Sequence, residues 1–323
     1  IIKMMNRVRG TYGLGILFSD IPDTVFAARK DSPLIVGYGK DCALLASDVP
    51  AILKYTRDVY YLENMEIARL TEREITFFNM DQEQIEKQPV HIDWDAQAAE
   101  KEGYEHFMLK EIHEQPKAVR DTLGACIHKD GEQLSLDLSA YGMPDTLLQS
   151  IRRICITACG SAYHVGMAAK YILEDLARIP VDVDVASEFR YRKPMLEPDT
   201  LVIIVSQSGE TADSLAALRE AKRQGSPVLA IVNVVGSSIA READYVFYTL
   251  AGPEIAVATT KAYATQLAAS FLLAIHIAAL RGKLSQAQQQ TLLQQLLALP
   301  DQIARELEDK ERIQWFASQY SAA

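Results

Sequence analysis

The chain has 323 residues, of which 49% are hydrophobic and 24% are charged, so its composition is that of a globular protein and excludes disorder over most of its length. Its 33 basic and 43 acidic side chains give a formal net charge of −10. Since binding to nucleic acid phosphates requires a basic face, this balance argues against nucleic acid as the main partner.

The cysteines and histidines argue against two further classes of protein. None of the four cysteines belongs to a CxxC pair and the six histidines are scattered, so a structural zinc site is not expected. Four cysteines are also too few for a disulfide framework in a chain of this length, which indicates a reducing compartment and predicts a cytoplasmic protein.

The first 80 residues predict a β-rich region. Short apolar runs separated by turn residues cover 12–18, 24–28, 34–38 and 59–62, and a hairpin is expected at 68–71 and 75–78. A short helix is expected at 49–55, with Asp48 as its N-cap and Pro50 in its first turn. The polar stretch 79–103 has few apolar anchors and predicts a domain boundary.

The next part of the chain alternates between strand and helix patterns. The expected strands are 151–158, 181–185, 201–205, 228–232 and 245–249, and the expected helices are 161–177, 212–224 and 260–281. The run 201–205 is apolar throughout, as is typical of a central parallel strand buried on both faces. The alternation predicts an α/β domain with a doubly wound parallel sheet.

Helical patterns flank this domain at 104–123 and 285–317. They contain Pro116 and Pro300, which we expect to interrupt them, because proline removes a helical hydrogen bond.

The longest apolar stretch predicts a buried helix and no membrane span. It covers residues 264–280 and is interrupted by the polar residues Gln266, Ser270 and His276. The N-terminus lacks the pattern of a signal peptide and begins with Ile1, from which we expect the chain to be a piece of a longer protein.

The segment Ser206-Gln-Ser-Gly-Glu-Thr211 combines three hydroxyls, an amide and a glycine between a predicted strand and a predicted helix. The N-terminus of a helix offers unpaired N–H groups and a partial positive charge, so hydroxyl donors beside it can hold a phosphate without a lysine. Ser206 and Ser208 could instead only cap the helix, but capping needs one hydroxyl, so we favour phosphate binding. The nucleotide-binding motifs GxxxxGK[ST] and GxGxxG are absent, which favours a sugar phosphate over a nucleotide, and the absence of GxSxG argues against a nucleophile elbow.

Two further loops have the same placement. Gly160 and Ser161 follow a predicted strand and open the next helix, where Ser161 could simply cap the helix or donate to a ligand. Adjacent parallel strands would bring this loop to the same crevice, which strengthens the ligand-binding interpretation. Before the long helix, Thr259 or Thr260 can cap that helix or face the crevice. Lys261 is electrostatically unfavourable in the first turn of this helix, so it is expected to pair with an acidic neighbour or to face a ligand.

Several long motifs resemble one enzyme family. Residues 151–283 resemble a sugar isomerase (SIS) domain, and the motifs within them are ACGSAYH at 158–164, ASEFRYR at 186–192, SQSGET at 206–211 and EIAVATTKAY at 254–263. Upstream, 35–63 resembles the second half of a glutaminase domain and 106–116 resembles an inter-domain segment. Together they are similar to the glutamine–fructose-6-phosphate aminotransferases (isomerizing), or glucosamine-6-phosphate synthases.

The resemblance implies an organisation in four parts. These are a partial glutaminase domain of the N-terminal nucleophile type at 1–95, an inter-domain linker with helices at 96–145, a first SIS domain of flavodoxin-like topology at 146–283, and a helical segment at 284–323 that would lead to a second SIS domain. Members of the family use glutamine to aminate and isomerise fructose 6-phosphate to glucosamine 6-phosphate. They require no metal or organic cofactor and usually form homodimers through their SIS domains.

The resemblance also implies the site residues. Ser206, Gln207, Ser208 and Thr211 would hold the sugar phosphate, Ser161 would contact the sugar, and Val257 and Thr259 would line its site. Ala162 stands where many members have a serine that contacts the phosphate. The family's nucleophilic N-terminal cysteine, general-base glutamate, ring-opening histidine and Schiff-base lysine match no residue here. We therefore expect this chain to bind sugar phosphate weakly at best and not to complete the reaction.

Other interpretations follow from different classes of protein. A non-catalytic SIS module that binds sugar phosphates usually accompanies a DNA-binding helical domain and a basic face, and the sequence predicts neither. A stand-alone phosphosugar isomerase would need its own acid and base near the crevice, and none is evident. We expect His164 to be a surface residue, and Cys155 and Cys159 to share a buried face of one strand. Glu188 could line the crevice or a subunit interface.

Overall fold

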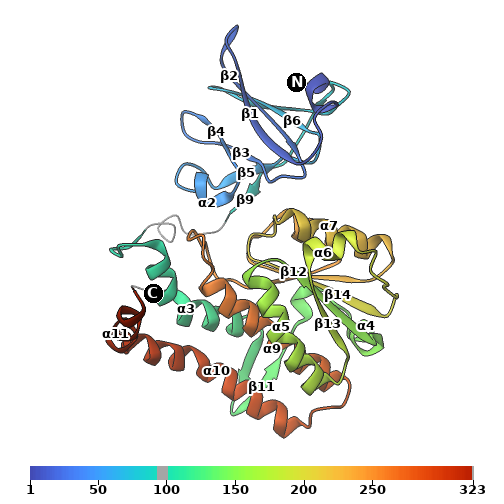
Figure 1. Cartoon of the computed structure of the whole chain (residues 1–323), viewed down its shortest axis with the longest axis vertical. Coiled ribbons are helices and arrows are strands. Elements are labelled where there is room, and N and C mark those ends of the chain that lie inside the picture. The colour runs from blue at the N-terminus through green and yellow to red at the C-terminus, as the bar shows by residue number, and fades with distance from the viewer. Residues whose placement is uncertain (93–100, 322–323) are drawn as a thin grey trace. The chain divides into compact units, whose positions relative to one another are not determined.

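The computed structural model describes residues 1–92 and 101–321 of the chain, which divides into two compact units (Figure 1). The units are Ile1–Glu102 and Gly103–Ala323, so their boundary falls within the polar stretch 79–103. The finer division at 95, 145 and 283 stays a prediction.

The first unit contains two antiparallel sheets with the strand orders β1-β2-β6-β7-β8 and β4-β3-β5-β9. Its elements are α1 (Ile2–Met5), β1 (Tyr12–Phe18), β2 (Ile21–Lys30), β3 (Ile35–Tyr38), β4 (Ala43–Ala46), α2 (Val49–Ile52), β5 (Asp58–Tyr61), β6 (Ile67–Thr71), β7 (Ile75–Phe78), β8 (Gln84–Ile85) and β9 (Val90–His91). The antiparallel pairing of β6 with β7 confirms the predicted hairpin. Asp48 caps α2 by accepting a hydrogen bond from the N–H of Ala51, as predicted, although this helix ends three residues earlier than expected.

The second unit is built on a five-stranded parallel sheet with the order β13-β12-β14-β15-β16. Its strands are β12 (Arg153–Ala158), β13 (Val181–Val185), β14 (Thr200–Ser206), β15 (Val228–Val232) and β16 (Tyr245–Tyr248). The helices that precede, connect or follow them are α4 (Asp145–Ser150), α5 (Ser161–Ala177), α6 (Ala186–Tyr191), α7 (Ala212–Arg223), α8 (Ser238–Glu242) and α9 (Lys261–Leu280). This order confirms the doubly wound, flavodoxin-like topology.

The sheet is covered on both faces, and the alternation of side chains along β14 shows why. Leu201, Ile203 and Val205 belong to the apolar core that α5 and α9 complete. Val202 and Ile204 point the other way, into the core that α6, α7 and α8 complete. Because successive side chains of a strand point to opposite faces, a strand buried on both sides must be apolar throughout.

Among the described residues, one helix, α9, is long and apolar enough to cross a membrane by length and composition alone. Within its unit it packs against α3 (Phe107–Gly124) and α5, and most of its apolar side chains are fully buried. It is a core helix of this unit, as predicted.

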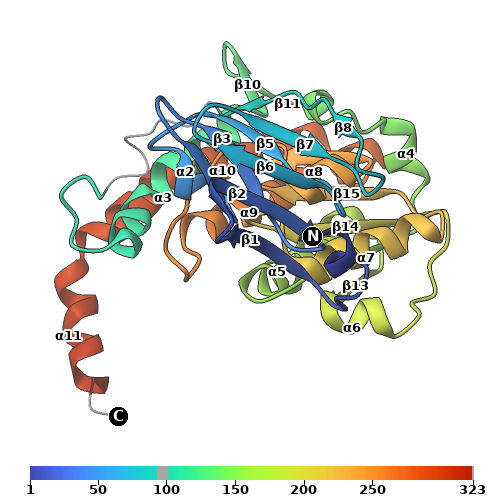
Figure 2. The ribbon, with the colours of Figure 1, turned by 90° about the horizontal axis from the view of Figure 1, so that it is seen from above.

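The remaining elements of the second unit are η2 (Ser139–Tyr141), the hairpin of β10 (Ile127–Asp130) and β11 (Gln133–Leu136), and the helices α10 (Gln286–Glu308) and α11 (Lys310–Tyr320). The long helices α3 and α10 pack against each other. Figure 2 shows α11 extending away from the rest of its unit, and no side chain of α11 is buried.

The expected interruptions at Pro116 and Pro300 were wrong, since both prolines lie inside continuous helices. Pro116 cannot donate to the carbonyl oxygen of Ile112, but the side-chain amide of Gln115 donates to that oxygen at 3.0 Å instead. Pro300 lies on the buried face of α10, where packing holds the helix together. The helical stretch breaks at Asp309 instead, between α10 and α11.

Candidate functional site

The carboxyl ends of the neighbouring strands β12 and β14 border a cavity of about 190 Å³. The chain leaves these two strands toward opposite edges of the sheet, which is the position where open α/β sheets bind ligands. The cavity is lined by Cys159, Ser161, Ala162, Val205, Ser206, Gln207, Ser208, Thr211, Thr259 and Gln266. It therefore brings together every predicted site residue except Val257, and all of its lining residues are uncharged.

The loop of residues 206–211 presents its hydroxyls at the N-terminus of α7. Ser206 Oγ accepts a hydrogen bond from the N–H of Gly209 at 3.0 Å and lies 3.3 Å from the hydroxyl of Thr211. Ser208 Oγ accepts from the N–H of Glu210 at 3.2 Å. Thr211 is the N-cap residue of α7, but its side chain makes no capping hydrogen bond. The hydroxyls thus shape the loop rather than cap the helix, which argues against the capping interpretation.

The 206–211 loop is held by the neighbouring segment that follows β15. The N–H of Asn233 donates to the carbonyl of Gln207 at 3.2 Å, and the N–H of Ile239 donates to the carbonyl of Gly209 at 2.9 Å. The carboxylate of Glu210 accepts from the N–H of Ser238 at 2.7 Å. These bonds fix the loop before any ligand arrives, so little ordering entropy is lost on binding.

The first turn of α5 forms a second wall of the cavity. Gly160 precedes this helix with a φ of +57°, a conformation that favours glycine, and Ser161 and Ala162 follow it. The prediction that Cys155 and Cys159 share one strand was wrong, because β12 ends at Ala158. Cys155 is buried, and burial raises the pKa of its thiol to about 12. Cys159 is half-buried and lines the cavity.

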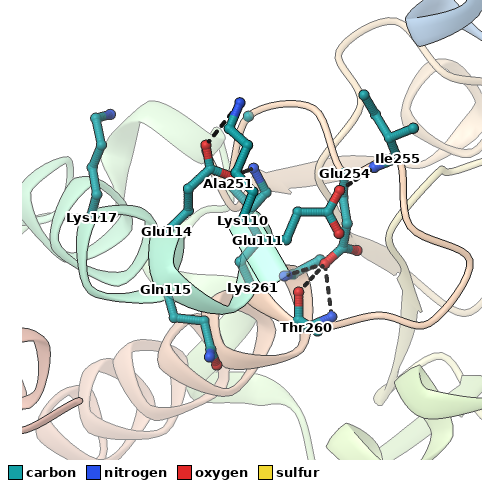
Figure 3. Close-up of polar contacts among 12 residues, drawn as sticks. Lys110, Glu111, Glu114, Gln115, Lys117, Ala251, Glu254, Ile255, Thr260 and Lys261 are labelled. Atoms are coloured by element: carbon teal, nitrogen blue, oxygen red, sulfur yellow. Dashed lines mark hydrogen bonds and ion pairs between the residues drawn. The ribbon is translucent and has the colours of Figure 1, made fainter. Parts of the chain in front are cut away.

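The segment before α9 adds Thr259 to the cavity and is organised by a buried carboxylate. Of the two roles left open for Thr259 and Thr260, side-chain capping of α9 is not seen, because Thr260 is the N-cap residue but its side chain makes no capping hydrogen bond. Glu254 Oε1 accepts instead from the N–H groups of Thr260 at 2.9 Å and of Ala262 at 3.1 Å (Figure 3). Burial raises the pKa of Glu254, and the neighbouring Glu111 adds to this rise, while the two N–H donors and the nearby Lys261 oppose it.

Helix α3 holds the same segment from the other side (Figure 3). Glu111 Oε1 accepts from the N–H groups of Ile255 at 2.6 Å and of Ala256 at 3.0 Å. The ammonium of Lys261, only 3% exposed, lies 2.7 Å from the carboxylate of Glu114. Lys261 therefore pairs with an acidic neighbour, which confirms one of the two outcomes expected for it.

Three residues considered in the sequence lie outside the cavity lining. The side chain of Val257 is fully exposed, and the structure does not bring it to the other predicted residues. His164, on α5, is exposed as expected, and Glu188, on α6, is exposed too. Within residues 1–92 and 101–321, no group of three or more His, Cys, Asp or Glu side chains is placed to hold a metal ion.

Cys159, Val205 and Gln266 line the cavity although the sequence did not predict them for the site, and Gln266 is the one with an amide side chain. It lies in the second turn of α9 and is only 1% exposed. The signal was present, since Gln266 is the first polar residue that interrupts the apolar stretch 264–280. In the sequence alone, this interruption argues only against a membrane span.

Comparison with known proteins matches residues 147–276 to the SIS domain family. These residues form an SIS domain. Over 318 residues the chain is 52% identical to the glutamine–fructose-6-phosphate aminotransferase (isomerizing) of Caldanaerobacter subterraneus subsp. tengcongensis. The aligned residues make up 98% of this chain and 52% of that protein. The enzyme of the same name from Clostridium acetobutylicum matches with the same identity and coverage. The resemblance seen in the motifs is confirmed, and the chain spans about half the length of the curated relatives it matches.

Two solved structures share this fold over 62% and 66% of the chain. The C-terminal domain of glucosamine-fructose-6-phosphate aminotransferase from Francisella tularensis matches with a TM-score of 0.58 and 42% identity, covering 62% of this chain and 56% of that chain. A putative phosphosugar isomerase from Clostridium difficile 630 matches with a TM-score of 0.55 at 22% identity, covering 66% of this chain and 57% of that chain, which shows the fold alone.

Proposed function

We propose that the chain is part of a glutamine–fructose-6-phosphate aminotransferase (isomerizing), and that its SIS domain binds the sugar phosphate. The observation that carries this proposal is the cavity at the N-termini of α5 and α7, lined by the hydroxyls of Ser161, Ser206, Ser208, Thr211 and Thr259. The similarity to the aminotransferases supports the choice of substrate, fructose 6-phosphate, and of product, glucosamine 6-phosphate.

In this proposal the phosphate lies against the 206–211 loop. The hydroxyls of Ser206, Ser208 and Thr211 and the amide of Gln207 donate to its oxygens, together with N–H groups of the first turn of α7. The partial positive charge of the helix N-terminus stabilises the phosphate dianion without a cationic side chain. Ala162 offers no hydroxyl, and the missing hydrogen bond costs about 1 kcal/mol of affinity.

The sugar lies against Ser161 and Thr259. The segment that contains Thr259 is held in place by Glu111 of α3 and by Glu254. The chain's residues bind and orient the sugar phosphate. The same proposal includes three properties of the complete enzyme. It has further catalytic groups, it uses glutamine, and it forms a homodimer through its SIS domains in the cytoplasm. The proposal assigns no metal or organic cofactor. The isolated chain should accordingly bind sugar phosphate without forming glucosamine 6-phosphate.

A non-catalytic SIS module is the alternative. The aminotransferase match covers 98% of the chain and therefore includes the β-rich first unit, which a match to the SIS domain alone would leave out. This coverage favours the aminotransferase.

Calorimetric titration of the purified chain tests the proposal, with fructose 6-phosphate as ligand and fructose as its unphosphorylated control. We expect only the phosphorylated sugar to bind. Ser208→Asp should weaken it at least about 100-fold, because like charges about 4 Å apart near a protein surface repel by about 4 kcal/mol.

The matched control is Ser318→Asp, which adds the same charge on the exposed helix α11 and should leave binding unchanged. If fructose binds as well as fructose 6-phosphate, or if the two variants behave alike, the 206–211 loop is not the phosphate site.

A further inference from the structure

Gln266 lines the cavity with a buried amide side chain that has no hydrogen-bond partner among the described residues. It is 1% exposed, and neither its Nε2 nor its Oε1 makes a hydrogen bond to any described residue. Buried polar groups in proteins are nearly always paired, and leaving one unpaired costs about 1–3 kcal/mol. An unpaired amide at a cavity wall therefore points to a partner that enters the cavity.

The other buried polar side chains of α9 do not share this condition. Thr265 Oγ1 donates to the carbonyl of Ala262 at 3.0 Å, and Ser270 Oγ donates to the carbonyl of Gln266 at 2.8 Å. Both hydroxyls are satisfied within their own helix, and neither residue lines the cavity. The unpaired state is thus specific to the one polar side chain of α9 that reaches the cavity.

The chemistry of an amide selects between the two parts of a sugar phosphate. An amide carries both donors and an acceptor, whereas the oxygens of a phosphate dianion only accept hydrogen bonds. A phosphate would therefore leave Oε1 buried without a donor. A hydroxyl donates and accepts, so it can satisfy both ends of the amide.

We propose that Gln266 binds a hydroxyl group of the sugar, and so makes the cavity select a polyhydroxylated phosphate ester over phosphate itself. This inference rests on the proposed function, since it places the phosphate on the 206–211 loop and the sugar toward α9. A site that pairs a buried amide with a hydroxyl discriminates strongly against ligands that lack it, because the amide is then left unpaired.

The test compares two ligands, fructose 6-phosphate and inorganic phosphate, on the full chain and on Gln266→Met, which replaces the amide with an apolar side chain of similar volume. We expect the variant to bind fructose 6-phosphate about 10- to 100-fold more weakly, as loss of one or two hydrogen bonds predicts, and to bind inorganic phosphate as the original chain does. The thermal unfolding midpoint without ligand should stay the same or rise, since an unpaired buried amide has been removed.

Ser270→Ala is the matched control, because it removes a buried hydroxyl of the same helix that is satisfied internally, and it should change neither affinity. Gln266→Leu repeats the experiment should the methionine variant fail to fold. An equal loss for both ligands, or no loss for either, would overturn the proposal. If the original chain binds inorganic phosphate but not fructose 6-phosphate, this inference fails while the phosphate site stands; if it binds neither ligand, the proposed function fails as well.

Discussion

At the scale of single residues, position 209 of the 206–211 loop has no room for a side chain larger than that of glycine. Its φ is +65°, and a Cβ built on it would lie 2.0 Å from Ser237 Oγ. Gly209→Ala should therefore destabilise the protein by about 1 kcal/mol for the left-handed backbone and by about 1–3 kcal/mol more for the overlap. It should also abolish binding of fructose 6-phosphate. Urea unfolding and calorimetry measure the two effects.

Gly225→Ala separates the two causes. Gly225 has a φ of +83° but no heavy atom within 4 Å of an added Cβ, so only the backbone cost of about 1 kcal/mol should appear there. Equal losses for the two variants would mean that the contact with Ser237 does not constrain the loop.

The site residues that could be predicted are those whose signal is local. Ser206, Ser208 and Thr211 lie within six residues at a strand-to-helix junction, so sequence spacing alone brings them together. Val257 and Gln266 show the opposite case. A motif predicted Val257 for the cavity, yet its side chain is exposed. Gln266 reaches the cavity only through the packing of α9, which no local pattern encodes.

At the scale of elements, the position of the segment before α9 depends on carboxylates of α3. Glu114→Ala would leave the ammonium of Lys261 buried with its closest carboxylate removed. Removing one partner of a buried ion pair costs about 3–5 kcal/mol, and we expect a loss near about 3 kcal/mol because Glu114 is itself 25% exposed. Urea unfolding would measure this loss.

Lys117→Ala provides the comparison on the same helix. Lys117 is 78% exposed, and Figure 3 shows it pointing away from this cluster, so its removal should cost less than about 0.5 kcal/mol. If both variants lose the same stability, the pair of Glu114 with Lys261 does not hold the segment.

The elements whose bounds could be predicted to the residue are those that directly follow a glycine or a proline. The helix 161–177 starts after Gly160, and the strand 181–185 follows Pro180, so pattern and boundary agree. Pro116 misled the prediction because the side chain of Gln115 replaces the missing donor. The short helices α4, α6 and α8 were missed, since a few residues carry too little periodicity to be recognised.

At the scale of the whole molecule, contacts between residues far apart in the chain make α3 part of the second unit's core. Motif resemblance assigned its residues to the linker 96–145. In the structure Val119 and Leu123 of α3 share a core with Ile154 of β12, inside the unit that carries the cavity. Contacts between residues far apart in sequence decide such membership, and a single sequence does not display them.

The uncharged lining of the cavity has a consequence for how the protein responds to ionic strength. A site that grips phosphate with lysines or arginines loses its attraction as added ions screen it. In the proposed site, neutral hydroxyls, amides and helix N-termini would hold the phosphate instead, within a molecule whose formal net charge of −10 weakly repels an anion. Raising potassium chloride from about 0.05 M to about 0.5 M should therefore leave the dissociation constant for fructose 6-phosphate within about threefold, or tighten it slightly by screening the repulsion. A tenfold weakening, measured by titration at both concentrations, would instead reveal a cation at the phosphate. Such tolerance would let the sugar phosphate be captured equally well in dilute and in concentrated electrolyte.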